Sequence, residues 1–164
     1  MATGDKIKRK MLKTYIDTSF GGQLDAGYTL IGSGIEELTV EMGANVNKVT
    51  DVLGITDVYI DKYEKTQSIT PFKCKEGDIL FESLQAVIDG DLTLDDLNTN
   101  VVDVKTWETE TAGEYPAIKE LCVIEVVSVG GNTEGLQIPY NIHRTGEKTS
   151  GTFNPTTKTF TETV

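Results

Sequence analysis

The sequence predicts a mainly β protein, a β-sandwich or open barrel flanked by one α-helix near residues 78–89 and carrying a long β-hairpin loop. Apolar and polar residues alternate from Leu38 to Ala44, as in a strand with one buried face. Short stretches rich in branched and aromatic residues, separated by Gly and Asn turn signals, fill the second half of the chain. Only one segment shows helical spacing. With 164 residues, the chain is expected to form one domain over residues 1–164.

Strands are expected in the first half at residues 9–17, 28–31, 38–44 and 57–61. Residues 45–56, between the last two strands, are too long for a tight hairpin turn and are predicted to be a loop that is mobile in the monomer. This loop contains Val46, Val49, Val52 and Leu53, which need a surface to lie on. The pattern therefore indicates a docking segment of an assembly.

The helix is predicted from an apolar stripe at spacings of three and four. The stripe consists of Leu80, Phe81, Leu84, Val87 and Ile88. Asp78 is placed to cap the N-terminus of this helix, and Gly90 to adopt the left-handed conformation that ends it.

The second half of the chain is predicted to return to β structure. The expected strands cover residues 101–108, 119–129, 136–143, 151–153 and 157–163, with turns at 130–132, 145–146 and 154–155. The segment from Leu121 to Val129 is apolar on both faces apart from Glu125 and Ser128, so it is expected to be the central strand, with the helix on one side.

The net charge of −11 is unevenly distributed. Residues 1–13 form a basic N-terminal arm, and removing the five bases and one acid of residues 5–13 leaves 10 bases and 25 acids, a net charge of −15. Such an acidic body repels nucleic acid. The arm is open to three interpretations: a nucleic-acid tail, a solvated terminal strand, or a contact with an acidic neighbouring subunit such as its Asp89–Asp96 segment. Its bases are Lys6, Lys8, Arg9, Lys10 and Lys13.

No apolar run approaches membrane-spanning length, and the N-terminus lacks the apolar core of a signal peptide, so folding in a cytoplasm is expected. Cys74 and Cys122 lack the spacing of a zinc site or a disulfide framework.

Motifs of catalysis and ligand binding are weak. Gly32-Ser33-Gly34 lacks the lysine and spacing of a phosphate loop, and His143 is the single histidine. Asp89–Asp96 resembles a calcium loop but has Leu94 at the sixth position and Asn100 at the twelfth. We therefore expect no enzyme activity, no cofactor and no metal.

Several blocks of sequence resemble the tail tube proteins, or major tail proteins, of tailed phages and prophages of Gram-positive bacteria. The resemblance covers roughly residues 8–162 and depends on the order of elements and on short blocks, none diagnostic alone. The blocks are Lys10-Met-Leu-Lys-Thr-Tyr15, Gly34-Ile-Glu-Glu-Leu-Thr-Val-Glu41, Asp51-Val-Leu-Gly-Ile-Thr-Asp57, Asp61-Lys-Tyr-Glu-Lys-Thr-Gln67, Gln137-Ile-Pro-Tyr-Asn-Ile-His143 and Gly151-Thr-Phe153.

This resemblance implies a structural virion protein, assembled in the bacterial cytoplasm into hexameric rings. The rings stack into a hollow tail tube through which viral double-stranded DNA passes without specific binding. Implied partners are other copies of the chain and the tape measure, terminator and distal tail proteins, with no membrane. The loop between the first strand pair would reach the next ring. That ring-stacking loop comprises Asn45, Val46, Asn47, Lys48, Val49, Thr50, Asp51, Val52 and Leu53.

Alternation assigns a lumen face to the same strand pair. If Leu38, Val40, Met42, Val58 and Ile60 face the core, the residues between them face the channel. The predicted lumen residues are Glu37, Thr39, Glu41, Asp57, Tyr59 and Asp61. Their carboxylates would repel DNA phosphates.

Other functional classes remain open at this point. The chain is also compatible with the tube of a contractile tail or injection machine, with a ring protein related to tail terminators, and with a carbohydrate-binding β-sandwich that uses Trp107 and Tyr115.

Overall fold

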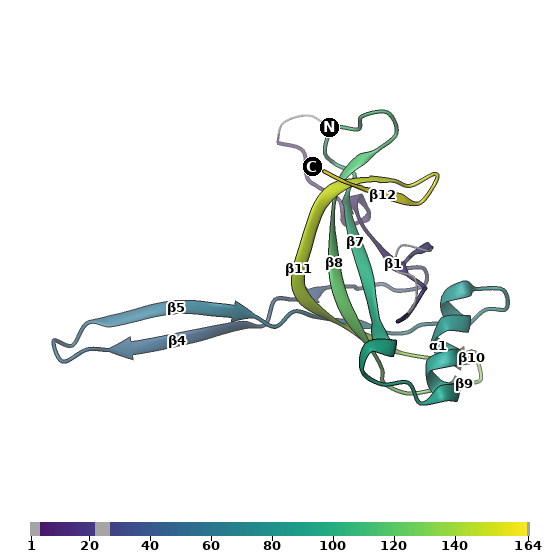
Figure 1. Cartoon of the computed structure of the whole chain (residues 1–164), viewed down its shortest axis with the longest axis horizontal. Helices are drawn as coiled ribbons and strands as arrows, with labels where there is room; N and C mark the ends of the chain where they lie inside the picture. Colours follow the sequence, from purple (N-terminus) through teal and green to yellow (C-terminus); the bar gives the residue numbers. More distant parts are fainter. Residues whose placement is uncertain (1–3, 22–26, 164) are drawn as a thin grey trace.

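One large antiparallel sheet dominates the computed structural model, which describes residues 4–21 and 27–163. The chain is 50% strand and 12% helical, so the mainly β fold with one flanking helix is confirmed. The order across the sheet is β2 (Tyr28–Leu30), β1 (Leu12–Asp17), β7 (Asn98–Lys105), β8 (Tyr115–Val126), β11 (Tyr140–Asn154), β6 (Thr66–Ile69) and β3 (Val40–Glu41), and β12 (Thr159–Glu162) pairs with β11. Figure 1 shows β7, β8 and β11 running side by side as its long curved strands.

The strand predicted to be central is central. β8 lies between β7 and β11, and it begins at Tyr115, earlier than expected. β11 is longer than expected because residues 145–146 do not form a turn. They lie in an irregularity between Arg144 and Lys148, where the register against β8 shifts and the strand continues.

Residues 136–143, expected to be one strand, belong to two. β10 (Gly135–Gln137) pairs with β9 (Gly130–Asn132) in a separate small sheet, and β11 begins only at Tyr140. Pro139, which has no N–H to donate to a ladder, stands between them.

The first strand is also shorter than predicted, because a short 3-10 helix at Arg9–Met11 precedes β1.

The helix α1 (Ile79–Gly90) agrees with the prediction. The Asp78 carboxylate accepts a hydrogen bond from the backbone N–H of Leu80 at 3.0 Å. The left-handed residue at its C-terminus is Asp91 (φ 46°) rather than Gly90, so the helix ends one residue later than expected. Two further short segments, η1 (Arg9–Met11) and η2 (Leu94–Leu97), are 3-10 helices.

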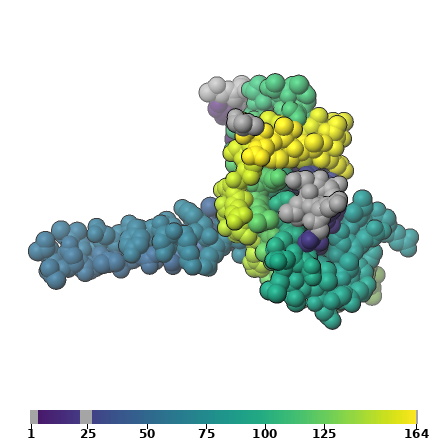
Figure 2. Space-filling view, in the orientation of Figure 1, coloured from purple at the N-terminus to yellow at the C-terminus, as the bar shows by residue number. Residues whose placement is uncertain are grey.

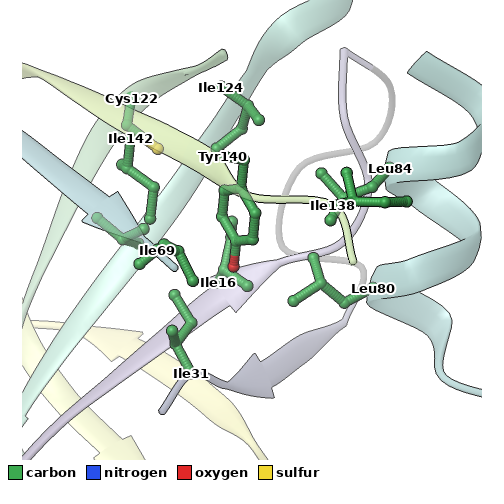
Figure 3. Packing of buried hydrophobic residues seen from close by; sticks show 11 residues of the cluster. Ile16, Ile31, Ile69, Leu80, Leu84, Cys122, Ile124, Ile138, Tyr140 and Ile142 are labelled. Atoms are coloured by element: carbon green, nitrogen blue, oxygen red, sulfur yellow. The ribbon is translucent and has the colours of Figure 1, made fainter. Parts of the chain in front are cut away.

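Buried apolar residues cover both faces of the sheet. On one face, Leu80 and Leu84 of α1 pack on the cluster of Figure 3, which includes Ile16, Ile124 and Tyr140. On the opposite face, a smaller cluster gathers around Phe153. Its ring centroid lies 4.5 Å from that of Tyr15 and 5.6 Å from that of Tyr28, and Val102, Val104 and Ala117 complete it. These two clusters fix the curved sheet from both sides.

The predicted loop at residues 45–56 is instead mostly strand. β4 (Ala44–Thr50) and β5 (Thr56–Tyr63) form a two-stranded hairpin that projects from the body (Figures 1 and 2). The strand expected at residues 38–44 is broken by Gly43 (φ 58°), so that only Val40 and Glu41 join the main sheet as β3. The branched residues of the segment favour strand structure, and a cross-strand ladder satisfies their backbone groups.

Candidate assembly surfaces

The projecting hairpin is exposed along its whole length. Every residue of β5 is exposed, and in β4 only Asn47 is partly covered. The prediction that Val58 and Ile60 face the core is therefore wrong for the single chain, in which they are 60% and 48% exposed. They lie on the projecting hairpin, outside the two buried clusters of the main sheet.

The two faces of the hairpin differ in chemistry. Val46 pairs with Ile60, and Lys48 pairs with Val58, which places three apolar side chains on one face. The other face carries Asp57, Tyr59 and Asp61, the predicted lumen residues of this strand, and Val49. Asn45 lies on that second face, like Asn47. The register irregularity leaves Asp61 as an extra residue of β5 between Ile60 and Lys62, and the Asn45 amide donates to its carboxylate at 2.8 Å. Val58 and Ile60 therefore lie on the opposite face of the hairpin from Asp57 and Tyr59.

The tip of the hairpin is a structured turn. The Asp51 carboxylate accepts hydrogen bonds from the backbone N–H groups of Leu53, at 2.9 Å, and Ile55, at 3.0 Å. The turn presents apolar side chains to solvent: Val52 is 102% exposed, Leu53 79% and Ile55 55%. Leaving three such side chains bare on an ordered turn is typical of a contact surface.

A close backbone approach marks the base of the hairpin. The backbone N–H of Glu64 donates to the carbonyl of Gly43 at 3.0 Å. A Cβ at position 43 would lie 2.2 Å from the carbonyl oxygen of Glu64. Glycine is required there because of this contact and its positive φ, and the chain turns out of the main sheet at that point.

A polar face of the main sheet lies across β6, β11 and β8, on the side opposite to α1. Residues of these strands alternate between buried and more exposed, and the polar ones on this face are Thr66, Ser68, Glu125, Asn141 and His143. The Glu125 carboxylate lies 2.6 Å from His143 Nε2 and 3.2 Å from the Asn141 amide. These hydrogen bonds, that of His143 first, lower the pKa of Glu125. We call these five residues the polar sheet face.

The structure divides the predicted lumen residues into two groups. Glu41 pairs with Thr66 and so lies on the polar sheet face. Glu37 and Thr39 line, with Glu41, one surface hollow of about 590 Å³. Asp57, Tyr59 and Asp61 lie out on the hairpin. The contributions of β8 and β11 were missed, although the alternation of Tyr140-Asn-Ile-His-Arg144 is the same signal that identified the segment at residues 38–44.

A buried network of charges lies on the other face of the sheet. Lys65 Nζ bonds the Glu120 carboxylate, and their side chains are 8% and 2% exposed. Arg144, 3% exposed, donates to Asp103 through both terminal nitrogens and to Gln67 at 3.0 Å. Burial opposes the charge of Arg144, but hydrogen bonds and charge from Asp103 and Glu120 prevail and raise its pKa. Sequence patterns did not identify this network.

The predicted basic arm is partly built into the fold. Lys13 lies within β1, paired with Val104, and is half-buried. Arg9 donates to the carbonyl of Leu38 at 3.0 Å and so ties the arm to the segment before β3. Lys6, Lys8 and Lys10 are exposed, and residues 1–3 of the arm lie outside the described part of the chain.

The predicted sugar-stacking residues, Trp107 and Tyr115, lie close together at the surface. Trp107 and Tyr115 line one shallow surface hollow, and the Tyr115 hydroxyl donates to Glu110 at 3.0 Å. Within residues 4–21 and 27–163, no three His, Cys, Asp or Glu side chains gather as metal ligands would. No helix in this described part is both long and apolar enough to span a membrane.

Comparison with known proteins found no matching family model and no matching curated sequence.

Proposed function

We propose that this chain is a self-assembling structural protein that forms the tail tube of a phage, as rings stacked into a hollow channel for DNA. The observation that carries the proposal is the projecting hairpin, an ordered ribbon with bare apolar side chains on one face and at its tip. Free strand edges and exposed apolar surface are hazards to a monomer and useful joints in an assembly. The number of six subunits per ring comes from the family resemblance.

The polar sheet face is the proposed channel wall, with Glu41 beside it. The face and Glu41 together carry two carboxylates and short polar groups and no Lys or Arg, as a surface that lets DNA slide requires. Tyr59 and Asp61 would extend this lining along the hairpin, whereas Asp57 lies next to its turn. The proposed ring-stacking contact is the hairpin turn with the preceding strand, residues 45–55, together with the apolar side chains that lie opposite that strand, Val58 and Ile60.

Electron microscopy and sedimentation of the concentrated protein test the proposal. Tubes, or rings that stack, are expected for the wild type, and a chain that stays monomeric at every concentration would refute it. Tubes enclosed by a sheath in the virion would favour the contractile alternative.

A pair of matched variants tests the role of the hairpin. Val58→Glu should abolish stacking and leave the circular dichroism spectrum unchanged, because the Val58 side chain is exposed on the hairpin and belongs to neither buried cluster. Val127→Glu is the control, since Val127 is similarly exposed (55% against 60%) but lies outside the hairpin. Normal tubes from Val58→Glu would contradict the role assigned to the hairpin.

Charge reversal tests the channel. The variant Glu41→Lys/Asp61→Lys is expected to form tubes that slow DNA ejection and bind DNA at low salt, because added cations attract phosphate. Unchanged ejection and no DNA binding would remove the repulsion argument.

A further inference from the structure

A concave pocket lies on the sheet face that carries the buried charges. Its volume is about 530 Å³, and the segment before the hairpin closes one side of it. Apolar side chains form much of its wall: Leu12, Leu38, Val40, Met42, Trp107 and Ile118. We call this cavity the basic pocket, for the following reason.

Cations outnumber carboxylates around this pocket. Asp103 and Glu120 are its acids, and both are already bonded to the buried cations Lys65 and Arg144. Three further cations line the pocket: Arg9, Lys105 and Lys148. The local excess of positive charge contrasts with the net charge of −11 for the whole chain. The pocket therefore favours an occupant that is apolar and flanked by negative charge.

The tip of the hairpin has that chemistry. Val52, Leu53 and Ile55 are its exposed apolar residues, and Asp51 and Asp57 flank them, with no Lys or Arg between residues 49 and 57. The hairpin projects away from the body of its own chain (Figure 2), so a tip that enters this pocket must come from a second copy.

We propose that the basic pocket is the receptor for the hairpin tip of another copy of this chain. The proposal rests on the assembly proposed above and specifies where the stacking hairpin binds. Leu53 enters between the apolar walls, and Asp57 faces the rim cations. The basic arm of a neighbour is disfavoured as occupant, because like charges repel.

Directed disulfide formation tests this pairing in the full-length chain. All variants carry Cys74→Ser, since Cys74 is partly exposed and Cys122 is buried. Chains with Leu53→Cys are mixed with chains carrying Met42→Cys, at the pocket wall. The matched controls place the second cysteine on the polar sheet face (Ser68→Cys) or on the arm (Lys6→Cys).

A cross-linked dimer from the Leu53→Cys and Met42→Cys pair, in clear excess over the Ser68→Cys control, is expected. Tubes that form without this cross-link would overturn the pocket assignment and leave the tube proposal standing. The cross-link without tubes would support the docking and count against the tube. A further mixture, of Met42→Cys chains with Lys6→Cys chains, tests the arm: if this pair cross-links and the Leu53→Cys pair does not, the arm is the occupant and the proposal is refuted.

A charge exchange gives an independent readout. Asp57→Lys and Lys148→Glu should each lower the cross-linking yield by about two- to fivefold, and the double variant should recover it. Trp107 is the single tryptophan and lies in the pocket wall, so its emission should shift to shorter wavelength on assembly. No recovery in the double variant, together with unchanged Trp107 emission, would contradict docking at this pocket.

Discussion

Removing one carboxylate from the buried charge network should destabilise the fold severely. In Glu120→Gln, the buried Lys65 ammonium loses its only recorded ion-pair partner among the described residues. The backbone N–H of Gly146 donates to the Glu120 carboxylate at 3.1 Å, and in the variant it can donate to the side-chain amide oxygen of the glutamine instead. Breaking a buried ion pair by removing one partner costs about 3–5 kcal/mol, because it leaves a buried charge uncompensated.

A matched control exists on the same strand. Glu125→Gln is the same chemical change five residues further along β8, but the Glu125 side chain is 53% exposed, against 2% for Glu120. Exposed ion pairs contribute about 0–1 kcal/mol, so this variant should stay close to the wild type. Urea unfolding followed by circular dichroism measures both, and at this chain length 3–5 kcal/mol corresponds to a fall in Tm of roughly 6–20 °C.

Equal stability of the two variants would refute the reasoning, since it would mean that water or relaxation compensates the Lys65 charge. A paired replacement separates charge from packing. Lys65→Met/Glu120→Leu removes both charges and leaves Arg144 bonded to Asp103, so it should recover at least half of the loss.

Three smaller predictions concern Gly43 at the base of the hairpin, the buried thiol of Cys122 and the polar sheet face. Gly43→Ala should destabilise the hairpin base by about 1–3 kcal/mol and speed its proteolysis, because the added Cβ meets the carbonyl oxygen of Glu64; wild-type proteolysis would contradict this. Burial raises the pKa of Cys122 to about 12, so at pH 8 it should resist thiol reagents until the chain is unfolded, and rapid labelling of the native chain would be the contrary result. His143→Ala should raise the lowered pKa of Glu125, as measured by NMR titration. Any stability that this pair contributes is present above the ordinary carboxyl pKa and is lost as the pH falls through the lowered pKa. An unchanged titration of Glu125 would show that the hydrogen bond from His143 does not cause the lowered pKa.

Local patterns predicted the helix and the central strand well. The stripe from Leu80 to Ile88 and the capping Asp78 all lie within twelve residues of sequence, so a local pattern is enough to predict the helix. The apolar run of β8 was equally clear, because a strand buried on both faces leaves few polar positions.

The buried charges escaped prediction because their partners are distant in sequence. Lys65 and Glu120 are 55 residues apart, and Arg144 and Asp103 are 41 apart. Composition rules place such residues on the surface, and only the pairing of β6, β7, β8 and β11 brings them together.

The hairpin was predicted in part, and the reason for the error is physical. Period-two alternation found one strand, but Gly43 shifts the chain out of the sheet, so alternation beyond it no longer refers to the same core. Residues 45–56 were predicted to be a loop because they are too long for a tight turn, but much of that length pairs as the ladder of β4 and β5, and none of the ladder residues is buried in this chain.

That absence of burial is the strongest constraint on any function assigned to this chain. Two-stranded hairpins are marginally stable in water, and within residues 4–21 and 27–163 this one pairs with no third strand. Its turn is nevertheless fixed by two hydrogen bonds to Asp51, and a third joins the hydroxyls of Thr50 and Thr56 at 2.9 Å. Polar groups thus hold the hairpin in shape, while Val46, Val58 and Ile60 remain exposed. Such a preorganised segment is suited to bind an apolar surface on another molecule. A catalytic or sugar-binding role located in the body would leave this extension unexplained, whereas the assembly proposed above gives it a role.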